Sequence, residues 1–224
     1  LRGGLYRIPS PGLPLGVSGL PDNYITIEGY PGEEMVLTGD LGLPLSWTPY
    51  SGNIWQATVS LLGEWMRGVD DVWEEDHFLW KYASLIELQG PGFYHDRAGG
   101  RLYVWLSDGG DPNTRSMHIS QETGDWRDVH ARLLGITGSY LEIKGLTFRW
   151  ANQAIKQQGK WCVVDGCQAS PVHYLMVTGA GSTGNIVRNC HADGGPGYNT
   201  YKFRTYNGWP HGRGIWFKEN LISF

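Results

Sequence analysis

The stretch Ile143-Lys144-Gly145-Leu146-Thr147-Phe148 is the first of four similar segments in the second half of the chain. The other three are Val164–Ala169, Val187–Ala192 and Lys218–Ser223. Their central residues lie 21, 23 and 31 positions apart and are Gly145, Gly166, Asn189 and Asn220. A spacing of 21 to 23 residues predicts one coil of a stacked β structure per repeat. Gly or Asn at each centre predicts a tight turn with positive φ.

The positions beside each centre predict which residues face the core. The position before the centre is, in order, Lys144, Asp165, Arg188 and Glu219, so stacked coils bring opposite charges together. The position after it is apolar in every repeat: Leu146, Cys167, Cys190 and Leu221. We therefore expect the charged column to face outward and Ile143, Val164 and Val187 to be buried. Cys167 and Cys190 should stack in adjacent coils as buried, unpaired thiols.

The remainder of the chain also favours β structure. Gly accounts for 33 of the 224 residues, and Gly and Pro interrupt the chain too often for long helices. Short runs such as Leu102–Leu106 have the β-branched and aromatic composition of strands. Residues 70–80 are the one segment whose pattern permits a helix, and we expect their acidic side chains to form a solvated face.

Tryptophans punctuate the first half of the chain. We expect most of them to build a small core beneath long loops, because Gly-rich segments supply little apolar area themselves. A groove that binds glycan is the alternative. The residues concerned are Trp47, Trp55, Trp65, Trp73 and Trp80.

Composition and charge argue against several classes of protein. The formal net charge is only −4, which disfavours a basic surface for nucleic acid. No apolar run reaches the length of a membrane-spanning helix, about 18 residues or more, and no signal-peptide pattern is present, so a secretion signal is expected to be absent or already removed. Three cysteines cannot all pair within the chain, so we expect small buried hydrophobes, with one disulfide and a leftover thiol as the alternative.

Several stretches together resemble a known family. Tyr140–Arg149 looks like the entry coil of right-handed parallel β-helix proteins of the pectate-lyase-like type. Residues 3–7 with 25–33 resemble their first coil, and residues 92–97 with 100–105 resemble a β-rich insertion of their carbohydrate-active members. The resemblance implies an all-β chain that forms a right-handed parallel β-helix (β-solenoid) with a β-rich insertion in the N-terminal half. It specifies the fold better than the reaction, because one fold hosts many chemistries.

The same reasoning divides the chain into three parts. Residues 1–40 would form the first coil, residues 41–135 the Trp-containing insertion, and residues 136–224 the coils of 21 to 31 residues. The chain stops within its fourth repeat, whereas a solenoid ordinarily ends in a cap. We therefore expect either a longer β-helix or self-association through an open C-terminal coil.

The long coil, residues 193–213, is the best candidate for a binding site, because insertions in a solenoid tend to gather on the binding face. Its aromatic side chains offer flat faces to a sugar ring, and its cations reach hydroxyls or carboxylates. The alternative is a loop that only covers apolar surface. For substrate binding we single out Tyr201, Tyr206 and Trp209 of this coil together with His191 and Arg149.

Asp193, His211 and Arg213 are the candidate catalytic residues. Asp193 opens the long coil, and one edge of the stack should bring it together with Arg149, Asn152, His173 and His191. A glycoside hydrolase needs two carboxylates, about 5–5.5 Å apart in a retaining enzyme or about 6.5–9.5 Å apart in an inverting one, and no convincing second acid is evident. A lyase needs a base and a cation, which His211 and Arg213 would supply. No metal site is predicted and no cofactor is expected, with a calcium ion as the one alternative.

The resemblance, together with the candidate residues of the long coil, implies a polysaccharide-active enzyme, either a glycoside hydrolase or a polysaccharide lyase, that is extracellular or on the cell surface. The partner would be a polysaccharide or oligosaccharide of acidic or plant type, with no nucleic acid or membrane partner. The alternative is a non-catalytic β-helix surface or fibre protein that binds glycan or assembles with copies of itself. Convergence of two acids, or of a base and a cation, beside the long coil would separate the two.

Overall fold

The computed structural model describes residues 1–9, 11–61, 68–121, 132–178 and 182–192, together with the backbone of 201–202 and 215–218. Nearly all regular structure in these ranges is β-strand, and one short 3-10 turn, η1 (Pro112–Thr114), is the helical element there. The prediction of an all-β chain is confirmed. In this part of the chain no helix is long and apolar enough to cross a membrane.

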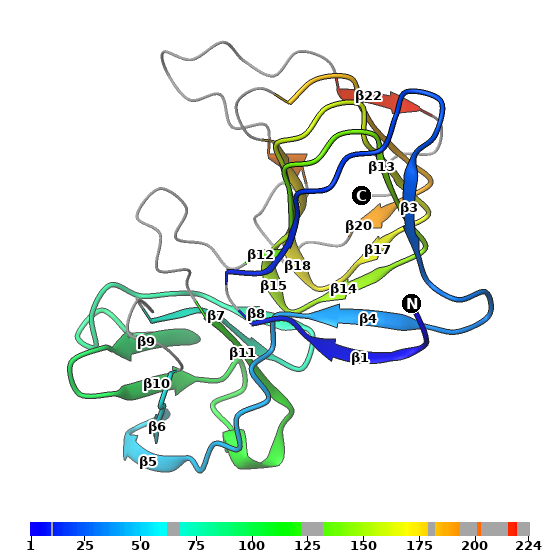
Figure 1. The fold of residues 1–224 in the computed structure, drawn as a ribbon. Helices are drawn as coiled ribbons and strands as arrows, with labels where there is room; N and C mark the ends of the chain where they lie inside the picture. The colour runs from blue at the N-terminus through cyan, green and yellow to red at the C-terminus, as the bar shows by residue number, and fades with distance from the viewer. Residues whose placement is uncertain are drawn as a thin grey trace, which may run out of the picture.

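Three five-stranded parallel sheets make up the larger part of the molecule, which we call the stack (Figure 1). The first contains β1 (Gly4–Arg7), β4 (Met35–Thr38), β14 (Thr147–Arg149), β17 (Gln168–Ala169) and β20 (His191–Ala192). The second contains β2 (Leu13–Leu15), β12 (Arg132–Ile136), β15 (Ala151–Gln157), β18 (Val172–Thr178) and β21 (Tyr201–Lys202). The third contains β3 (Ile25–Glu28), β13 (Leu141–Lys144), β16 (Val163–Asp165), β19 (Asn185–Arg188) and β22 (Ile215–Lys218).

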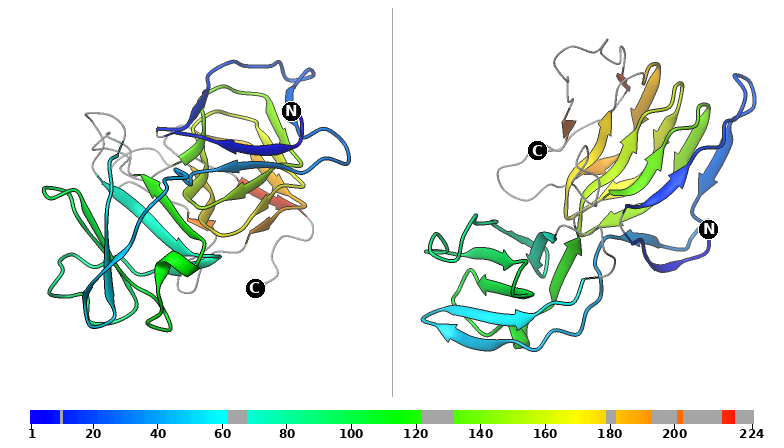
Figure 2. Two further views of the ribbon diagram at one scale, coloured as in Figure 1. Left: turned by 90° about the horizontal axis from the view of Figure 1, so that it is seen from below. Right: turned by 60° about the vertical axis from the view of Figure 1, so that its left-hand side comes forward.

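The chain visits these sheets in a fixed rotation. From β12 onward, each set of three consecutive strands places one strand in each sheet, so a strand pairs with its equivalent from the next repeat. The pairs are parallel, and the strands form a regular ladder in side view (Figure 2). The predicted period of 21 to 23 residues is therefore the distance along the chain from one strand to its neighbour in the same sheet.

The core of the stack confirms the predicted inside and outside. Ile143, Val164 and Val187 are buried and lie in register on adjacent strands. Lys144, Asp165 and Arg188 are likewise in register, and the Arg188 guanidinium lies 2.8 Å from Asp165 Oδ2. The fourth member was misplaced: the register pairs Arg188 with Lys218 rather than Glu219. The last repeat is 31 residues long, so the period of the earlier repeats does not fix which of its residues pair with β19. The sequence alignment of this repeat was therefore wrong by one residue.

The turns follow the predicted backbone geometry. Gly145, Gly166 and Asn189 have φ angles of 60°, 62° and 51°, which lie in the left-handed region. A Cβ atom at Gly145 or Gly166 would meet no other atom within 4 Å. These positions therefore require a residue that adopts positive φ, but they leave room for a side chain. Asn meets both conditions, which explains why it replaces Gly in the third repeat.

The stacked cysteines are also confirmed. All three cysteines are free and buried. Cys167 Sγ donates to the Ile143 carbonyl at 3.7 Å, and Cys190 Sγ donates to the Val164 carbonyl at 3.6 Å. Because Ile143 and Val164 are equivalent residues of adjacent repeats, the two thiols occupy equivalent places one repeat apart.

The segment between β4 and β12 forms antiparallel sheets of its own, which we call the insertion. One sheet contains β5 (Thr48–Ser51), β6 (Ile54–Thr58), β10 (Arg101–Trp105) and β9 (Gly92–Asp96), and the other contains β11 (Met117–Gln121), β7 (Val69–Glu74) and β8 (His77–Leu79). Side chains from both sheets share a second core that includes Val72, Phe93 and Leu102.

Two predictions about the insertion are settled by this arrangement. Residues 70–80 are not helical but form the β7–β8 hairpin, and Asp70 and Asp71 are buried instead of solvated. The expectation failed because β7 pairs with both β8 and β11 and is buried along its whole length, whereas the acidic residues considered alone suggest a surface segment. Trp47 and Trp73 are core residues and Trp55 packs against that core, whereas Trp80 is exposed and Trp65 lies outside the described residues.

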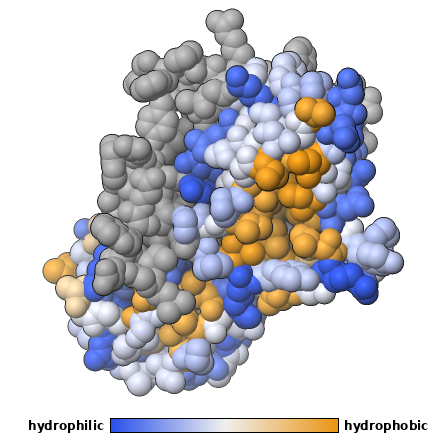
Figure 3. All heavy atoms as spheres, in the orientation of Figure 1, coloured by the Kyte–Doolittle hydropathy of each residue, from blue (hydrophilic) through white to orange (hydrophobic). Residues whose placement is uncertain are grey.

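Strands β1, β2 and β3 leave an apolar surface at one end of the stack. β1, β2 and β3 are each the last strand of their sheet, so each has one edge without a strand partner among the described residues. Leu5, Leu13 and Ile25 on these strands are exposed, and Figure 3 shows a continuous apolar area on this side of the molecule. The predicted self-association concerns the opposite end, where the backbone of β22 is the last described strand of its sheet, and it stays a prediction.

Candidate functional site

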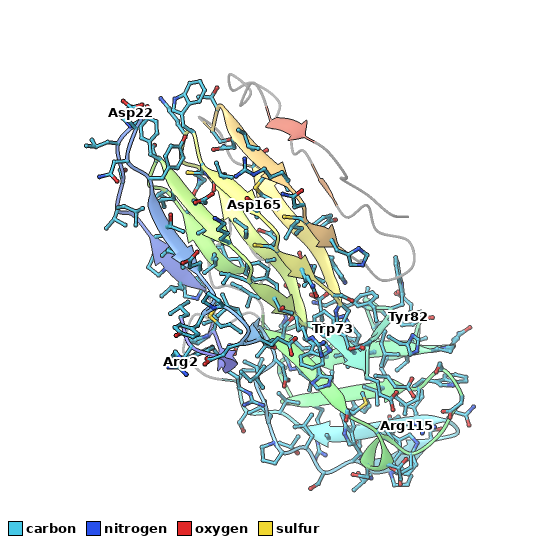
Figure 4. All side chains as sticks on the ribbon, turned by 90° about the vertical axis from the view of Figure 1, so that its right-hand side faces the viewer. Arg2, Asp22, Trp73, Tyr82, Arg115 and Asp165 are labelled. Carbon is cyan, nitrogen blue, oxygen red and sulfur yellow. The ribbon has the colours of Figure 1, made fainter. Side chains whose placement is uncertain are left out.

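Buried polar side chains gather where the insertion meets the stack. Strand β7 of the insertion contacts β15 of the stack. Trp73 marks this junction, between Asp165 on the stack and Arg115 at the far side of the insertion (Figure 4). Because charged groups are rarely buried without a partner, the junction is the part of the molecule that calls for a chemical explanation.

Three side chains from three separate segments form the centre of the junction. Asn152 Nδ2 lies 3.1 Å from His173 Nδ1, and His173 Nε2 lies 3.7 Å from Asp71 Oδ1. With the amide nitrogen as donor, Nδ1 accepts, and the proton of a neutral His173 ring sits on Nε2, facing Asp71. The three side chains are thus arranged in the order amide, imidazole, carboxyl.

Local structure explains how these residues meet. The parallel pairing of β15 with β18 sets Ala151 opposite Val172, so the next residues along, Asn152 and His173, lie side by side. Asp71 comes from β7, 81 residues before Asn152 and 102 before His173, and it reaches the pair only because the insertion packs against the stack.

Burial changes the electrostatics of Asp71. The side chain is 4% exposed, and its Oδ2 atom makes no hydrogen bond of good geometry. Burial is the main cause that raises the pKa of Asp71 well above its usual value, and the negative charge of Asp70 is the second. The groups that lower this pKa offset the rise only in part, and they are Lys81, Asn152 and Ser120. Asp71 is therefore a carboxyl group that holds its proton to a higher pH than an ordinary aspartate.

Aromatic rings enclose the imidazole. The ring of Phe78 meets His173 edge-on with centroids 4.4 Å apart, and Trp73 does so at 6.2 Å. These apolar walls lower the local polarity, which strengthens any electrostatic interaction with a bound group. The arrangement can therefore hold a proton and direct it toward a nearby acceptor.

A second cluster lies at the same junction. Asp40 Oδ2 lies 3.3 Å from His118 Nδ1, and Asp40 Oδ1 accepts from the Ile119 N–H at 3.2 Å. His118 stacks on Trp150 with centroids 3.6 Å apart, and Trp150 Nε1 donates to the Glu75 carbonyl. Burial alone would raise the pKa of Asp40, but the imidazole and the backbone N–H groups outweigh it, so that pKa lies below its usual value. Asp40 therefore behaves as an ionised anchor, in contrast to Asp71.

The predicted site residues have different outcomes. The structure brings Asn152 and His173 together, as expected for one edge of the stack. Arg149 and His191 lie in the neighbouring sheet, on β14 and β20; the Arg149 guanidinium lies 5.6 Å from the Trp150 ring centre, and His191 is exposed. Tyr201 is described by its backbone alone, in β21. The remaining candidates lie outside the described residues: Asp193, Tyr206, Trp209, His211 and Arg213.

Sequence reasoning missed Asp71 as a candidate acid. Its segment looked like a solvated acidic face, yet the apolar residues Val69, Val72 and Trp73 around it were a signal for a buried strand. No group of three or more His, Cys, Asp or Glu side chains suited to a metal ion occurs in the described ranges. The calcium ion stays a prediction.

Comparisons with known proteins identify similar folds. No family model and no curated protein sequence matches the chain. Among solved structures, the complex structure of XylC with xylose is similar, with a TM-score of 0.59 and 14% identity over 85% of this chain. A structure described as a glycoside hydrolase is similar too, with a TM-score of 0.51 and 10% identity over 87% of this chain. The matches cover 47% and 65% of those two chains, so this chain is similar in fold to parts of carbohydrate-active proteins.

Proposed function

We propose that this protein is a carbohydrate-active β-helix protein that hydrolyses glycosidic bonds, with its site at the junction of the stack and the insertion. Three parallel sheets visited in rotation support a parallel β-helix, and the strong preference for right-handed parallel crossovers supports its hand. Similarity to a glycoside hydrolase and to a protein solved with xylose favours hydrolysis over elimination and a plant-type glycan over other substrates.

The burial of the Asp71 carboxyl beside His173 is the observation that carries the proposal. A glycoside hydrolase needs one carboxyl group that is still protonated near neutral pH, so that it can protonate the leaving oxygen of the glycosidic bond. Burial shifts the pKa of Asp71 upward, the direction that such an acid needs, and its buried Oδ2 atom makes no hydrogen bond of good geometry. His173 and Asn152 would hold the carboxyl in position, and Trp73 and Phe78 would keep water away.

A second carboxylate has to complete the reaction. We assign this role to Asp193, which starts the long coil. His211 and Arg213 would lie beside the glycan. The residues that bind the glycan would be Tyr201, Tyr206, Trp209, His191 and Arg149. Asp71 would donate its proton as the bond to the leaving group breaks, and Asp193 would attack the sugar carbon or activate a water that does so. A glycan substrate also fits the expected extracellular or cell-surface location.

A polysaccharide panel tests the proposal. Incubation of the protein with soluble xylan and other plant glycans should release reducing ends without the 235 nm absorbance that elimination produces. Asp71→Asn should lower turnover by at least about 100-fold, the usual contribution of general acid catalysis. Asp108→Asn serves as the matched control, because Asp108 is an exposed acid of the insertion that pairs with Arg115.

The panel also defines what would refute the proposal. Full activity in Asp71→Asn would exclude Asp71 as the acid, and full activity in both Asp193→Ala and His211→Ala would move the site away from the long coil. Absorbance at 235 nm would identify a lyase. Circular dichroism and thermal unfolding of each variant separate loss of chemistry from loss of fold.

The burial of the junction favours a second candidate function. Asp71, Asn152 and His173 are each less than 5% exposed, as expected if they only fasten the insertion to the stack. The protein would then be a non-catalytic β-helix that binds glycan or assembles with copies of itself. Glycan binding without release of reducing ends by the native protein would support this function.

A further inference from the structure

The outer face of the β5–β6–β10–β9 sheet carries a group of tyrosines. Ala57, Leu102 and Val104 point into the core of the insertion, so the alternate residues of β6 and β10, including Gln56 and Tyr103, face the other way. Tyr103 is in register with Gln56 on one side and Tyr94 on the other. The face is thus built from side chains of neighbouring strands.

The rings on this face contact one another. Tyr94 and Tyr103 are nearly parallel, at 19°, with centroids 6.1 Å apart, and Tyr50 meets Tyr103 edge-on at 5.0 Å. Tyr103 is largely covered by this packing, whereas Tyr50 is 49% exposed and Tyr94 is partly exposed. The buried middle ring therefore fixes the two outer rings in place, and this reduces the entropy lost when a ligand binds.

The remaining groups on the face are polar and balanced in charge. Arg101 is in register with Thr58 on one side and Asp96 on the other, so one cation is matched by one carboxylate. Asp96 Oδ1 accepts from the N–H groups of Ala98 and Gly99, which holds the carboxylate at the end of its strand. A surface of tyrosine rings, hydroxyls and an amide with no net charge suits a neutral, hydroxyl-rich ligand.

The tyrosine face lies apart from the junction. Strand β7, in the other sheet of the insertion, contacts the stack, and the two sheets of the insertion pack on a shared core. In Figures 1 and 2, β5 and β6 lie at the side of the insertion away from the stack. A long ligand could therefore occupy this face without passing through the junction.

We propose that the tyrosine face, defined by Tyr50, Tyr94 and Tyr103 with Gln56 and Arg101, is a second glycan-binding surface that takes a neutral polysaccharide chain. Tyr50 and Tyr94 stack on the C–H faces of successive sugar rings, and Gln56 and Arg101 bond to hydroxyl groups. The choice of a glycan rests on the proposed function, while the surface itself rests on the geometry above. The face anchors a polymer to the protein independently of any hydrolysis.

Native affinity electrophoresis with soluble neutral β-1,4-xylan, followed by calorimetry with xylohexaose, tests this proposal. The native protein should be retarded by xylan. Tyr50→Ala and Tyr94→Ala should each weaken binding about tenfold, which corresponds to about 1.4 kcal/mol. Tyr30→Ala, which removes an exposed tyrosine of the stack, is the matched control and should bind as the native protein does.

A second arm separates this surface from the proposed active site. Asp71→Asn should bind xylan as tightly as the native protein, and Tyr50→Ala should hydrolyse a small chromogenic xyloside at the native rate. Binding by the native protein that both tyrosine variants retain would overturn the proposal, as would the absence of any retardation by xylan. If xylan is bound through these tyrosines but never cleaved, the surface stands and the hydrolase proposal fails.

Discussion

The stack and the insertion each bury a hydrophobic core, but they build it in different ways. In the stack, core side chains recur at equivalent positions of successive repeats, as Ile143, Val164 and Val187 do. In the insertion, the core joins side chains such as Phe93 and Val72 from two antiparallel sheets rather than from equivalent positions of a repeat. The difference shows why a repeat reveals its interior in the sequence, whereas a single antiparallel pair of sheets does not.

The two regions also carry different natural probes. The three cysteines, Cys162, Cys167 and Cys190, are all in the stack. Seven of the eleven tryptophans are in residues 41–135, at positions 47, 55, 65, 73, 80, 105 and 126. Thiol labelling therefore reports mainly on the stack and tryptophan fluorescence mainly on the insertion, so each region can be followed by itself.

The largest loss of stability should come from truncating a large buried side chain in the core of only one region. Phe148 and Phe93 are both fully buried, the first in the stack and the second in the insertion. Phe148→Ala and Phe93→Ala should each cost about 3–5 kcal/mol of stability, because truncation removes apolar contacts and leaves a cavity. Urea titration of Phe148→Ala should show earlier thiol labelling, while Phe93→Ala should show an earlier fluorescence transition. If both probes shift together in both variants, the two regions unfold as one unit.

The junction should show a dependence on pH that neither core has. Because the folded-state pKa of Asp71 is raised, folding favours the protonated carboxyl. Its contribution is fully present below the unfolded pKa, about 3.9, and is lost as the pH rises through the folded-state value. Asp71→Asn removes this loss, so its stability relative to the native protein should increase with pH, by about 1–3 kcal/mol at neutral pH.

Urea titrations at a series of pH values between 4 and 8 measure this difference. Asp108→Asn, an exposed acid whose pKa is lowered by the Gly110 N–H and by Arg115, provides the control with the opposite sign. A constant difference between Asp71→Asn and the native protein across the series would contradict the raised pKa.

The turns of the stack should show a smaller effect. Gly166 has a φ of 62° with open space where a Cβ would lie. Gly166→Val should cost about 1–2 kcal/mol, because a β-branched residue is strained in the left-handed region. Gly166→Asn should cost clearly less, since Asn189 takes this conformation in the next repeat. Equal thermal midpoints for the two variants would show that the turn tolerates any residue.

The smallest effect should come from the outward charges of the stack. Burial would raise the pKa of Asp165, but hydrogen bonds from Asn189 and Arg188 outweigh it and lower the pKa. The ion pair therefore stabilises the fold above the unfolded pKa of about 3.9 and is lost as the pH falls through the folded-state value. Arg188→Met should cost about 0.2–1 kcal/mol at neutral pH and nothing at acidic pH, as measured by thermal unfolding. A loss that persists in acid would assign the effect to packing instead.

Much of the stack could be predicted because its information is local and repeated. The spacing of Gly145, Gly166 and Asn189 located the turns, and the residues beside them gave the buried and exposed columns. Alternation along a strand and equivalence between repeats both act on neighbouring residues, so one sequence is enough to detect them. The register of the last repeat, where the spacing breaks, was lost for the same reason.

Tertiary structure alone decided the junction. Asp71 meets His173 and Asn152 because an antiparallel sheet packs on a parallel one, and no local pattern encodes that contact. The apolar residues Val69, Val72 and Trp73 indicate a buried strand, but they do not show which segment covers the carboxylates of Asp70 and Asp71. The pKa of Asp71 follows from that burial. Repetition thus determined the stack from the sequence, and long-range packing determined the chemistry.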